Sequence, residues 1–398
     1  MGFDQVIREG NANCRLCGQC LSRCAYLDLD RNEAISEIRK LRSGLATKIV
    51  EDKCVSCYAC ETFCLHGGHP YLAILDRRRS RYRREGITKS IEYMLLPSTG
   101  YFRSDAIQNL AYTDKIRIRS WSLNAKEDMF NEIVFPGCNV IVAPNLLSSG
   151  FLSNIPVVGS IELCCGEMIF RLGLIDEAER IAHKLEAFWK TKKIRKMVFI
   201  CPACYNMFEN VMPQLFGVKF NFEKVFIVQW LLNRIKTGDF RVKRPLLGQY
   251  CIHDSCHARV LGPQFMNEVR DLIRELGGEV VEPPRTGQDG LCCGIASASM
   301  KYSPIDIGLK ANRVLKGHAP LKEAQSMAYC TGCSLTLTMA EMILPSSVRW
   351  MHLLHLVALA GGFRVPRSMR SLAFPAMRAI VTKGVPKLFS KERVHLKI

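Results

Sequence analysis

The spacing of hydrophobic residues changes along this 398-residue chain from a helical pattern to an alternation of strands and helices. Near the N-terminus, Ile35, Ile38, Leu41 and Leu45 recur every three or four residues within positions 33–45. Residues at this spacing share one face of a helix. The pattern predicts a helical connection rather than a β-hairpin in this part of the chain.

From residue 132, short apolar strands alternate with amphipathic helices, and the alternation occurs twice with a period of about 120 residues. Such a repeat is typical of two related α/β units. In the first unit the predicted elements are strand Glu132–Phe135, strand Ile155–Val158, helix Asp176–Lys190 and strand Met197–Ile200. In the second unit they are strand Gln249–Ile252, strand Glu279–Val281, helix Asp306–Lys316 and strand Met327–Tyr329.

The composition fits a folded protein and adds one unusual feature. Hydrophobic residues make up 48% of the chain, which excludes a disordered or collagen-like protein. There are 19 cysteines, and the first ten residues have no apolar stretch of the kind that a secretory signal needs. Since thiols stay reduced in a cytoplasm, we expect a cytoplasmic protein whose cysteines bind metal.

The formal net charge of +18 lies mostly in two segments. Residues 76–89 carry seven positive and two negative side chains, and residues 364–398 carry nine positive and one negative. Together they indicate two surface patches rather than a groove lined with cations and stacking aromatic rings, so we expect no nucleic-acid partner.

Eight N-terminal cysteines form two runs with the same C-x2-C-x2-C-x3-C spacing. In ferredoxins with this spacing, the first three cysteines bind one [4Fe–4S] cluster and the fourth binds the other cluster. We therefore expect two cubane clusters, and a pair of zinc sites is the alternative. The expected ligands are Cys14, Cys17, Cys20 and Cys64 for one cluster and Cys54, Cys57, Cys60 and Cys24 for the other.

Each copy of the α/β repeat carries five further cysteines in the order C-x(n)-C-C-G-x(n)-C-x2-C. A tetrahedral zinc or a cubane cluster needs four ligands, and two adjacent cysteines do not easily occupy two corners of one small tetrahedron. Five cysteines therefore favour a larger or irregular iron–sulfur assembly; the alternatives are structural zinc, or one cluster with one degenerate copy. The sets are Cys138, Cys164, Cys165, Cys201 and Cys204, and Cys256, Cys292, Cys293, Cys330 and Cys333.

The motifs ELCCGE with CPAC and GLCCGI with CTGC, together with FPGC and HDSCH, resemble the cysteine-rich domains of heterodisulfide reductase B subunits. Residues 1–75 resemble the C subunit of these enzymes, and a chain that joins both parts is similar to the fused D-type protein of the same family. The resemblance implies one noncubane [4Fe–4S] cluster in each five-cysteine set. It also implies that a disulfide is cleaved between the sets, with Cys165 and Cys293 as catalytic residues.

Together these features predict a mixed α+β and α/β chain in five parts. The parts are a helical ferredoxin domain with two [4Fe–4S] clusters (1–89), a connecting segment (90–131), two tandem α/β cysteine-rich (CCG) domains (132–245 and 246–348) and a basic amphipathic segment (349–398).

The C-terminal segment combines apolar and basic residues. A helix over 350–363 would place Trp350, Leu353, Leu354, Val357 and Ala358 on one face. After it, nine Lys or Arg alternate with Leu372, Phe374, Met377, Ile380 and Leu388. Such a stretch is too short to span a bilayer but suits docking on anionic headgroups or on a membrane redox subunit. We expect a peripheral protein on the cytoplasmic face of the cell membrane; a solvated tail is the alternative.

A few residues outside these motifs have more than one interpretation. Cys251 is expected to be a buried, inert thiol. His253 and His257 flank Cys256 and are candidates to tune a cluster or to pass protons to a leaving thiolate, although a satisfied structural role fits equally well. His66 and His69 are weaker candidates of the same kind.

Neither a dinucleotide-binding G-x-G-x-x-G motif, a P-loop nor an H-E-x-x-H motif occurs, so electrons should come singly from a partner. Two functions remain. The first is the catalytic subunit of a disulfide reductase of heterodisulfide type. The second is an electron-transfer subunit of a membrane or flavoprotein dehydrogenase complex, with a cytochrome b, quinone or flavin partner and no disulfide substrate. A nucleic-acid enzyme is a weaker alternative, because such enzymes seldom need four cluster motifs.

Overall fold

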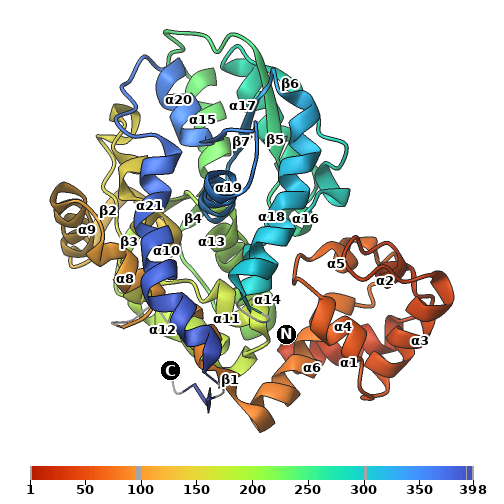
Figure 1. Ribbon diagram of the computed structural model, residues 1–398. Coiled ribbons are helices and arrows are strands. Elements are labelled where there is room, and N and C mark those ends of the chain that lie inside the picture. Colours follow the sequence, from red (N-terminus) through yellow and green to blue (C-terminus); the bar gives the residue numbers. More distant parts are fainter. Residues whose placement is uncertain (1, 96–99, 300–302, 391, 397–398) are drawn as a thin grey trace.

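A computed structural model describes residues 2–95, 100–299, 303–390 and 392–396, and it shows a helical N-terminal module beside two α/β units (Figure 1). The module contains α1 (Phe3–Asn13), α2 (Gln19–Ser22), α3 (Arg31–Arg42), α4 (Lys48–Lys53), α5 (Ala59–Phe63) and α6 (Pro70–Glu85). The helical character predicted for the cysteine-rich N-terminus is therefore confirmed.

Helix α3 is the predicted connection between the two cysteine runs. It begins after Asp30, whose carboxylate accepts a bond from the Glu33 amide at 2.9 Å while the Glu33 carboxylate accepts one from the Asp30 amide. This reciprocal cap fixes the start of the helix. Ile38 and Leu41 lie in the core, whereas Leu45 lies beyond the helix end and is exposed.

The segment predicted only as a connection holds three helices. They are α7 (Lys89–Leu95), α8 (Phe102–Gln108) and α9 (Tyr112–Asn124). Before them, the short strand β1 (Ile87–Thr88) pairs antiparallel with β9 (Arg393–Val394), so the start of this segment lies against the C-terminal end of the chain. Helix α8 also packs against α21 (Met369–Ala379).

The chain contains two α/β units, as predicted, and each is built on a parallel sheet. The first has the order β2-β3-β4 and the second the order β6-β5-β7-β8. In the first sheet, β2, β3 and β4 are the equivalents of β5, β7 and β8 in the second sheet. The bounds are β2 (Met129–Phe135), β3 (Lys193–Phe199), β4 (Glu223–Phe226), β5 (Gln249–His253), β6 (Glu279–Val281), β7 (Gln325–Ala328) and β8 (Trp350–His352).

The first sheet differs from the prediction at one edge. Residues 155–158 form no strand; Val157 makes a single parallel bridge to Val134, where the second unit has the whole strand β6. The shorter connection between Cys138 and Cys164 leaves less chain for pairing here. Strands β4 and β8 were not predicted.

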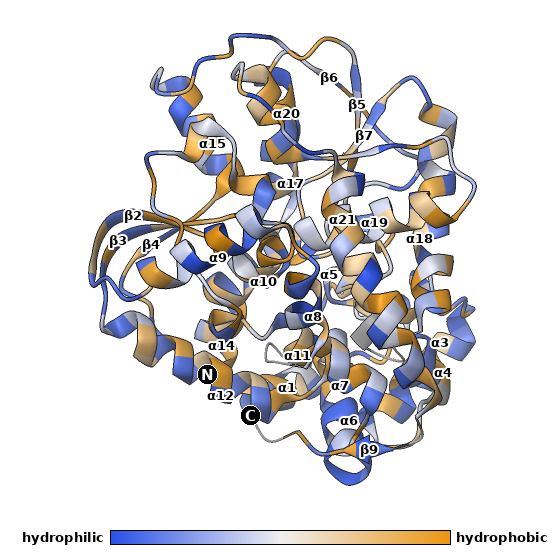
Figure 2. Ribbon diagram, turned by 60° about the vertical axis from the view of Figure 1, so that its left-hand side comes forward, coloured by the Kyte–Doolittle hydropathy of each residue, from blue (hydrophilic) through white to orange (hydrophobic). Residues whose placement is uncertain are grey.

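Helices cover the sheets, and apolar residues concentrate on the strands and on the inner sides of the helices, while α6 is largely hydrophilic (Figure 2). The first unit has α10 (Gly137–Ile141), α11 (Glu167–Leu172), α12 (Ile175–Lys190), α13 (Pro202–Asn206), the π-helical turn η4 (Met207–Val211), α14 (Met212–Phe216) and α15 (Ile227–Lys236). The second has α16 (Ala258–Leu261), α17 (Pro263–Glu275), α18 (Pro304–His318), α19 (Thr331–Ile343) and α20 (Leu353–Ala360), followed by α21.

The apolar face predicted for residues 350–363 belongs to the core. Trp350 lies in β8, which pairs with β7, and α20 begins only at Leu353. Leu353, Leu354 and Val357 are fully buried. This face is therefore not available for docking on a membrane, because it packs inside the second unit. Among the described residues, none of the helices combines the length and apolarity that crossing a bilayer requires.

Candidate iron–sulfur centres

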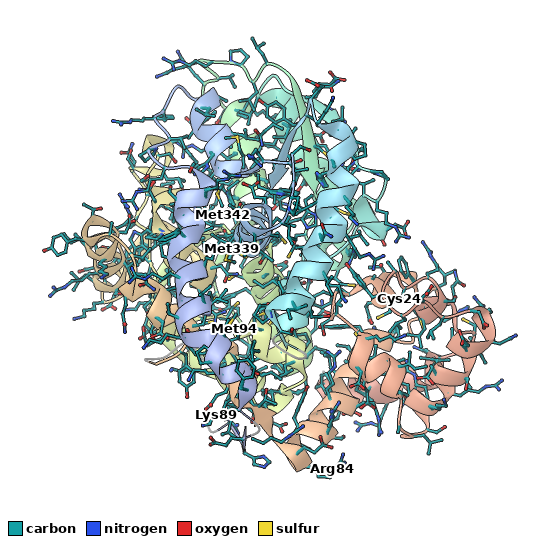
Figure 3. The ribbon with its side chains drawn as sticks, in the orientation of Figure 1. Cys24, Arg84, Lys89, Met94, Met339 and Met342 are labelled. Atoms are coloured by element: carbon teal, nitrogen blue, oxygen red, sulfur yellow. The ribbon has the colours of Figure 1, made fainter. Side chains whose placement is uncertain are left out.

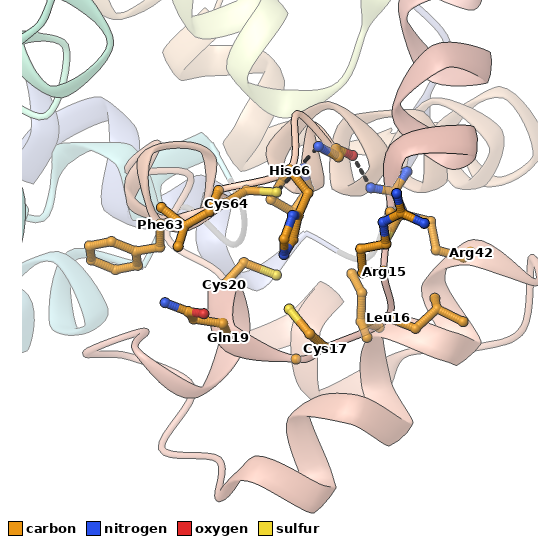
Figure 4. A pocket seen from close by; sticks show the side chains of 15 residues that line it. Arg15, Leu16, Cys17, Gln19, Cys20, Arg42, Phe63, Cys64 and His66 are labelled. Carbon is orange, nitrogen blue, oxygen red and sulfur yellow. Dashed lines mark hydrogen bonds between the residues drawn. The ribbon is translucent and has the colours of Figure 1, made fainter.

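The first group of thiols lines one pocket of the N-terminal module (Figure 4). Cys14, Cys17 and Cys20 come from the first run, and Cys64 comes from the end of the second run. Cys17, Cys20 and Cys64 point toward a common space in Figure 4. Burial raises the pKa of Cys20 to about 12, and the thiols of Cys64, Cys14 and Cys17, which line the same pocket, add to the rise.

The second group mirrors the first. Burial raises the pKa of Cys24 to about 12, with a further rise from the thiols of Cys57 and Cys54. Cys54, Cys57 and Cys60 lie together in the same way. The structure thus places each fourth cysteine beside the other run, while the binding of clusters by these groups stays a prediction.

Left-handed backbone turns aim the thiols of both runs. Leu16 and Gly18 have φ of 52° and 70°, and Ser56 and Tyr58 at the matching positions have φ of 55° and 64°. Residues other than glycine rarely adopt this region, so Ser56 and Tyr58 hold a conformation that costs on the order of 1 kcal/mol. In this conformation the amide of Ser56 donates a hydrogen bond to Cys54 Sγ at 3.4 Å.

The ten cysteines of the two repeats form one continuous string of thiols. Neighbouring thiols contact one another within each unit, and Cys165 Sγ lies 3.4 Å from Cys204 Sγ. The two units meet where Cys201 contacts Cys330. The order along the string is Cys138, Cys164, Cys165, Cys204, Cys201, Cys330, Cys333, Cys293, Cys292 and Cys256.

The carboxyl ends of equivalent strands produce this symmetry. Cys201 and Cys330 each follow the third predicted strand of their unit and stand at the N-cap of α13 and α19. Gly137 precedes Cys138 with φ +68°, and a Cβ there would lie 2.7 Å from Cys204 Sγ. The glycine of the FPGC motif therefore permits the close approach of backbone and thiol.

Buried arginines accompany the outer cysteines, and the sequence did not point to them. Arg103 of α8 is buried beside Cys138 and donates to the carbonyls of Met94 and Leu95 at 3.0 and 3.4 Å. It comes from the segment predicted as a mere connection. No motif marks a lone arginine in such a segment, so only the fold reveals it.

Arg171 takes the corresponding place in the second set. Its Nη2 lies 3.4 Å from Cys256 Sγ, and its Nε lies 2.5 Å from a carboxylate oxygen of Glu167. His257 Nε2 lies 3.1 Å from the same oxygen and also contacts Arg171. Burial alone would raise the pKa of Glu167, but Arg171 and His257 outweigh it and lower that pKa to about 2.

The second group of N-terminal thiols abuts the second repeat. The Tyr26 hydroxyl accepts a bond from the amide of Cys292 at 2.7 Å, and Arg259 Nη1 donates to the Cys57 carbonyl at 2.6 Å. Tyr26 lies two residues after Cys24, the cysteine of this group that is labelled in Figure 3. The side chains of Tyr26 and Arg259 thus connect the backbone of the second N-terminal cysteine group with the backbone of the second five-cysteine set.

A cavity of about 710 Å³ lies where the module meets both units. Its wall includes Tyr58, Tyr71, Asn206 and Arg259. The His69–Glu61 pair, whose Nδ1 and Oε1 atoms are 2.5 Å apart, is also part of the wall. The buried Tyr58 hydroxyl has no hydrogen-bond partner among the described residues.

The other residues singled out in the sequence lie in different surroundings. Cys251 is fully buried on β5, and burial raises the pKa of its thiol to about 12. His66 is exposed at the rim of the first pocket. A ring nitrogen of His253 lies within 4.8 Å of the Sγ atoms of Cys293 and Cys333. Burial lowers the pKa of His253 to about 4, so its ring is neutral.

The donor set suits iron–sulfur clusters. All 19 cysteines, each in the described part of the chain, are free thiols, and those of the repeats are buried. Groups of four and of five soft sulfur donors favour iron–sulfur clusters or zinc over hard cations such as magnesium. The residues present therefore fit the clusters that the motifs imply.

Comparison with known proteins also finds cysteine-rich iron–sulfur oxidoreductases. The family model for the cysteine-rich domain CCG matches residues 152–209 and 250–338, which include every cysteine of the two sets except Cys138. The D-type component of the dihydromethanophenazine:CoB–CoM heterodisulfide reductase of Methanosarcina mazei is 24% identical over 70% of this chain and 69% of its own length.

Two bacterial relatives match over shorter stretches. The EtfAB:quinone oxidoreductase of Syntrophomonas wolfei is 28% identical over 36% of this chain, and the probable iron–sulfur-binding oxidoreductase FadF of Bacillus subtilis is 31% identical over 46%. The matched parts span only 20% and 25% of those proteins. The chain therefore carries the cysteine-rich CCG domain twice and is related to iron–sulfur oxidoreductases, resembling the D-type component of heterodisulfide reductase over about 70% of its length.

Proposed function

We propose that this chain is the iron–sulfur subunit of a redox complex that passes electrons to a pair of clusters at which a disulfide is cleaved or formed. The observation that supports this most is the contact between the two five-cysteine sets at Cys201 and Cys330. Because the sets meet there, a disulfide placed between them has a sulfur-rich site on each side.

In this proposal each thiol group holds one cluster. The N-terminal groups hold two cubane [4Fe–4S] clusters, and the five-cysteine sets hold two noncubane [4Fe–4S] clusters. These clusters supply one-electron chemistry when bound. The protein contributes the ligands, the buried arginines Arg103 and Arg171 beside the outer thiols, and a site from which most water is excluded.

The packing suggests an order for the electrons. The group of Cys54 touches the second set through Tyr26 and Arg259, and Cys20 of the first group lies near Cys60 of the second. We propose that electrons pass from the first group to the second, then to the second set, and last to the first set. The reverse order holds when a disulfide is formed.

The reaction itself balances with two electrons and two protons. A disulfide takes up both electrons, its S–S bond breaks, and two thiols leave after protonation. Cys165 and Cys293 are each the middle thiol of their own five-cysteine set, and they are our candidates for the residues that act on the reacting sulfurs. The partner that supplies electrons is a flavoprotein or a membrane subunit of cytochrome b or quinone type.

The test uses the full chain, purified without oxygen. Adding thiols and disulfides of different size and charge should change the paramagnetic signals of the five-cysteine sets and leave those of the cubane clusters unchanged. A chain with a complete iron load whose signals respond to none of these compounds would contradict a disulfide substrate.

The second candidate is a pure electron conduit. It is supported by the relative named EtfAB:quinone oxidoreductase and by a surface of exposed apolar and basic residues along α21 and beyond. This surface consists of Phe374, Arg378, Val381, Lys383 and Phe389. Under this proposal the protein docks at the cytoplasmic face of the cell membrane against a quinone- or haem-bearing partner.

A further inference from the structure

His253 ends strand β5 and is buried next to the second five-cysteine set. One of its ring nitrogens and the Sγ atoms of Cys293 and Cys333 all lie within 4.8 Å of one another. Its Nε2 atom is buried and has no hydrogen-bond partner in the described part of the chain. Leaving a buried polar atom without a partner is unfavourable, so a group that pairs with it is expected at this place.

The surroundings hold the ring in position. The backbone of His253 is in register with Ala328 of β7. The ring packs edge-on against Trp350 at 5.9 Å and lies 6.3 Å from the ring of His318, which contacts the Ser326 hydroxyl at 3.0 Å. Strand pairing and these aromatic neighbours keep the imidazole close to the thiols.

The first repeat has no counterpart to this donor. Phe135 ends β2 three residues before Cys138, as His253 ends β5 three residues before Cys256. Phe135 packs against Phe199, Phe208 and Trp189 and offers no hydrogen bond. At this position the second cysteine set therefore has a buried donor where the first set has an apolar ring.

We propose that His253 donates a hydrogen bond through Nε2–H to a sulfur of the second five-cysteine set and thereby raises the reduction potential of the centre held there. This inference rests on the proposed function, since it requires a cluster at these thiols. A donor to sulfur stabilises the extra negative charge of the reduced state. His253 is a positioning and tuning residue, not one that touches a substrate.

The experiment is a redox titration of the full chain, purified without oxygen and followed by electron paramagnetic resonance. His253→Phe introduces the residue that the first repeat carries and should disfavour reduction of one centre about tenfold, a fall of about 59 mV for a one-electron step. The other midpoints should stay in place. Cys251→Ser changes a buried thiol on the same strand that stands outside the string of thiols, and it should shift none of the midpoints.

A second variant guards against loss of the cluster. If His253→Phe lowers the iron content, His253→Gln, which offers an amide donor, should restore the iron and return the midpoint toward wild type. Weak nitrogen coupling to one centre, lost in His253→Phe, supports the hydrogen bond. Coupling strong enough for an iron–nitrogen bond, or unchanged midpoints in an iron-complete His253→Phe chain, would overturn it.

The failure of this inference can be told apart from failure of the proposed function. Wild-type chain with iron only for the two cubane clusters removes the proposed function and this inference with it. Wild-type chain with a full iron load and an unshifted variant removes only the role of His253.

Discussion

At the residue scale, arginine rather than lysine accompanies the thiols. Arg103, Arg171 and Arg259 are almost fully buried. A guanidinium stays charged at every physiological pH and offers five donors in a fixed plane. One side chain can therefore bond backbone carbonyls and also face a sulfur, as Arg103 does with Met94, Leu95 and Cys138.

The central cysteines allow a direct test at this scale. Cys165→Ser or Cys293→Ser should abolish reduction of a disulfide by an artificial electron donor, because each removes a sulfur ligand from one set. The signals of the N-terminal cubane clusters should persist. Cys251→Ser is the matched control, since Cys251 is equally buried but stands outside the string. Full disulfide reduction by both serine variants would contradict the proposed catalytic sites.

Arg103 supplies a second test. Arg103→Met leaves the carbonyls of Met94 and Leu95 without their donor, and we expect the free energy of unfolding to fall by about 1–3 kcal/mol. The loss of positive charge should also make the centre at Cys138 harder to reduce. Arg103→Lys keeps the positive charge. It should therefore change the reduction potential of the centre at Cys138 less than it changes the free energy of unfolding. Denaturant titration and a redox titration measure the two effects, and the prediction fails if Arg103→Met changes neither.

At the scale of elements, a cluster of charges fastens the N-terminal module to the first unit. Arg79 and Arg83 of α6 bond both carboxylate oxygens of Asp176 on α12 at 2.6 to 3.1 Å, and Arg79 also pairs with Asp4 of α1. These contacts join three helices of which only α12 belongs to a repeat. The basic stretch 76–89 therefore serves partly as an internal contact and not only as a surface patch.

We predict that Asp176→Asn lowers the free energy of unfolding by about 1 kcal/mol, because the site is partly exposed. Burial would raise the pKa of Asp176, but the bonds from Arg79 and Arg83 lower it overall. The stabilisation is therefore complete above the unfolded pKa of about 4 and is lost as pH falls through the lower folded pKa. Urea titrations of both proteins should differ at pH 7 and converge in acid. A constant difference down to low pH would contradict this role.

The C-terminal elements need a test that keeps the fold. Cutting the chain after Ser346 would remove β8, α20 and α21, which complete the second sheet and its core. Such a truncation would report on folding and not on location. Substitutions confined to the exposed surface avoid this problem.

We predict that Phe374→Ser with Phe389→Ser weakens binding of the chain to vesicles with anionic headgroups, and that Lys383→Glu lowers the binding constant about tenfold at low salt. Leu247→Ser is the control, because Leu247 is 88% exposed and lies outside this surface. Sedimentation with vesicles measures the binding. Equal sedimentation of all variants would show that this surface is not the point of attachment.

At the scale of the whole molecule, contacts link the two N-terminal groups of thiols to the two five-cysteine sets, and we propose that each group holds one cluster. Four clusters of four irons predict about 16 iron atoms per chain when oxygen is excluded. Iron and zinc analysis of the purified protein checks this number. About eight irons with stoichiometric zinc would leave only the cubane clusters and contradict the noncubane assignment.

The sequence by itself determined the features that depend on local spacing. The three-residue steps of the cysteine runs, the alternation of strands and helices and the repeated CCG motif each follow from neighbours in the chain, and the parallel sheets and the helical module agree with them. Local patterns also gave the core face of α3. Such features can be predicted because a periodic pattern or a short motif carries them.

Only the tertiary structure decided what distant segments do to one another. It put Arg103 beside Cys138, joined Cys201 to Cys330, set Tyr26 against Cys292 and turned His253 toward the second set while Phe135 fills the same place in the first. It also converted the apolar stretch after Trp350 from a docking face into a strand and a buried helix. A single side chain has no period, and whether it is buried depends on which elements pack over it, so its role appears only when the chain is folded.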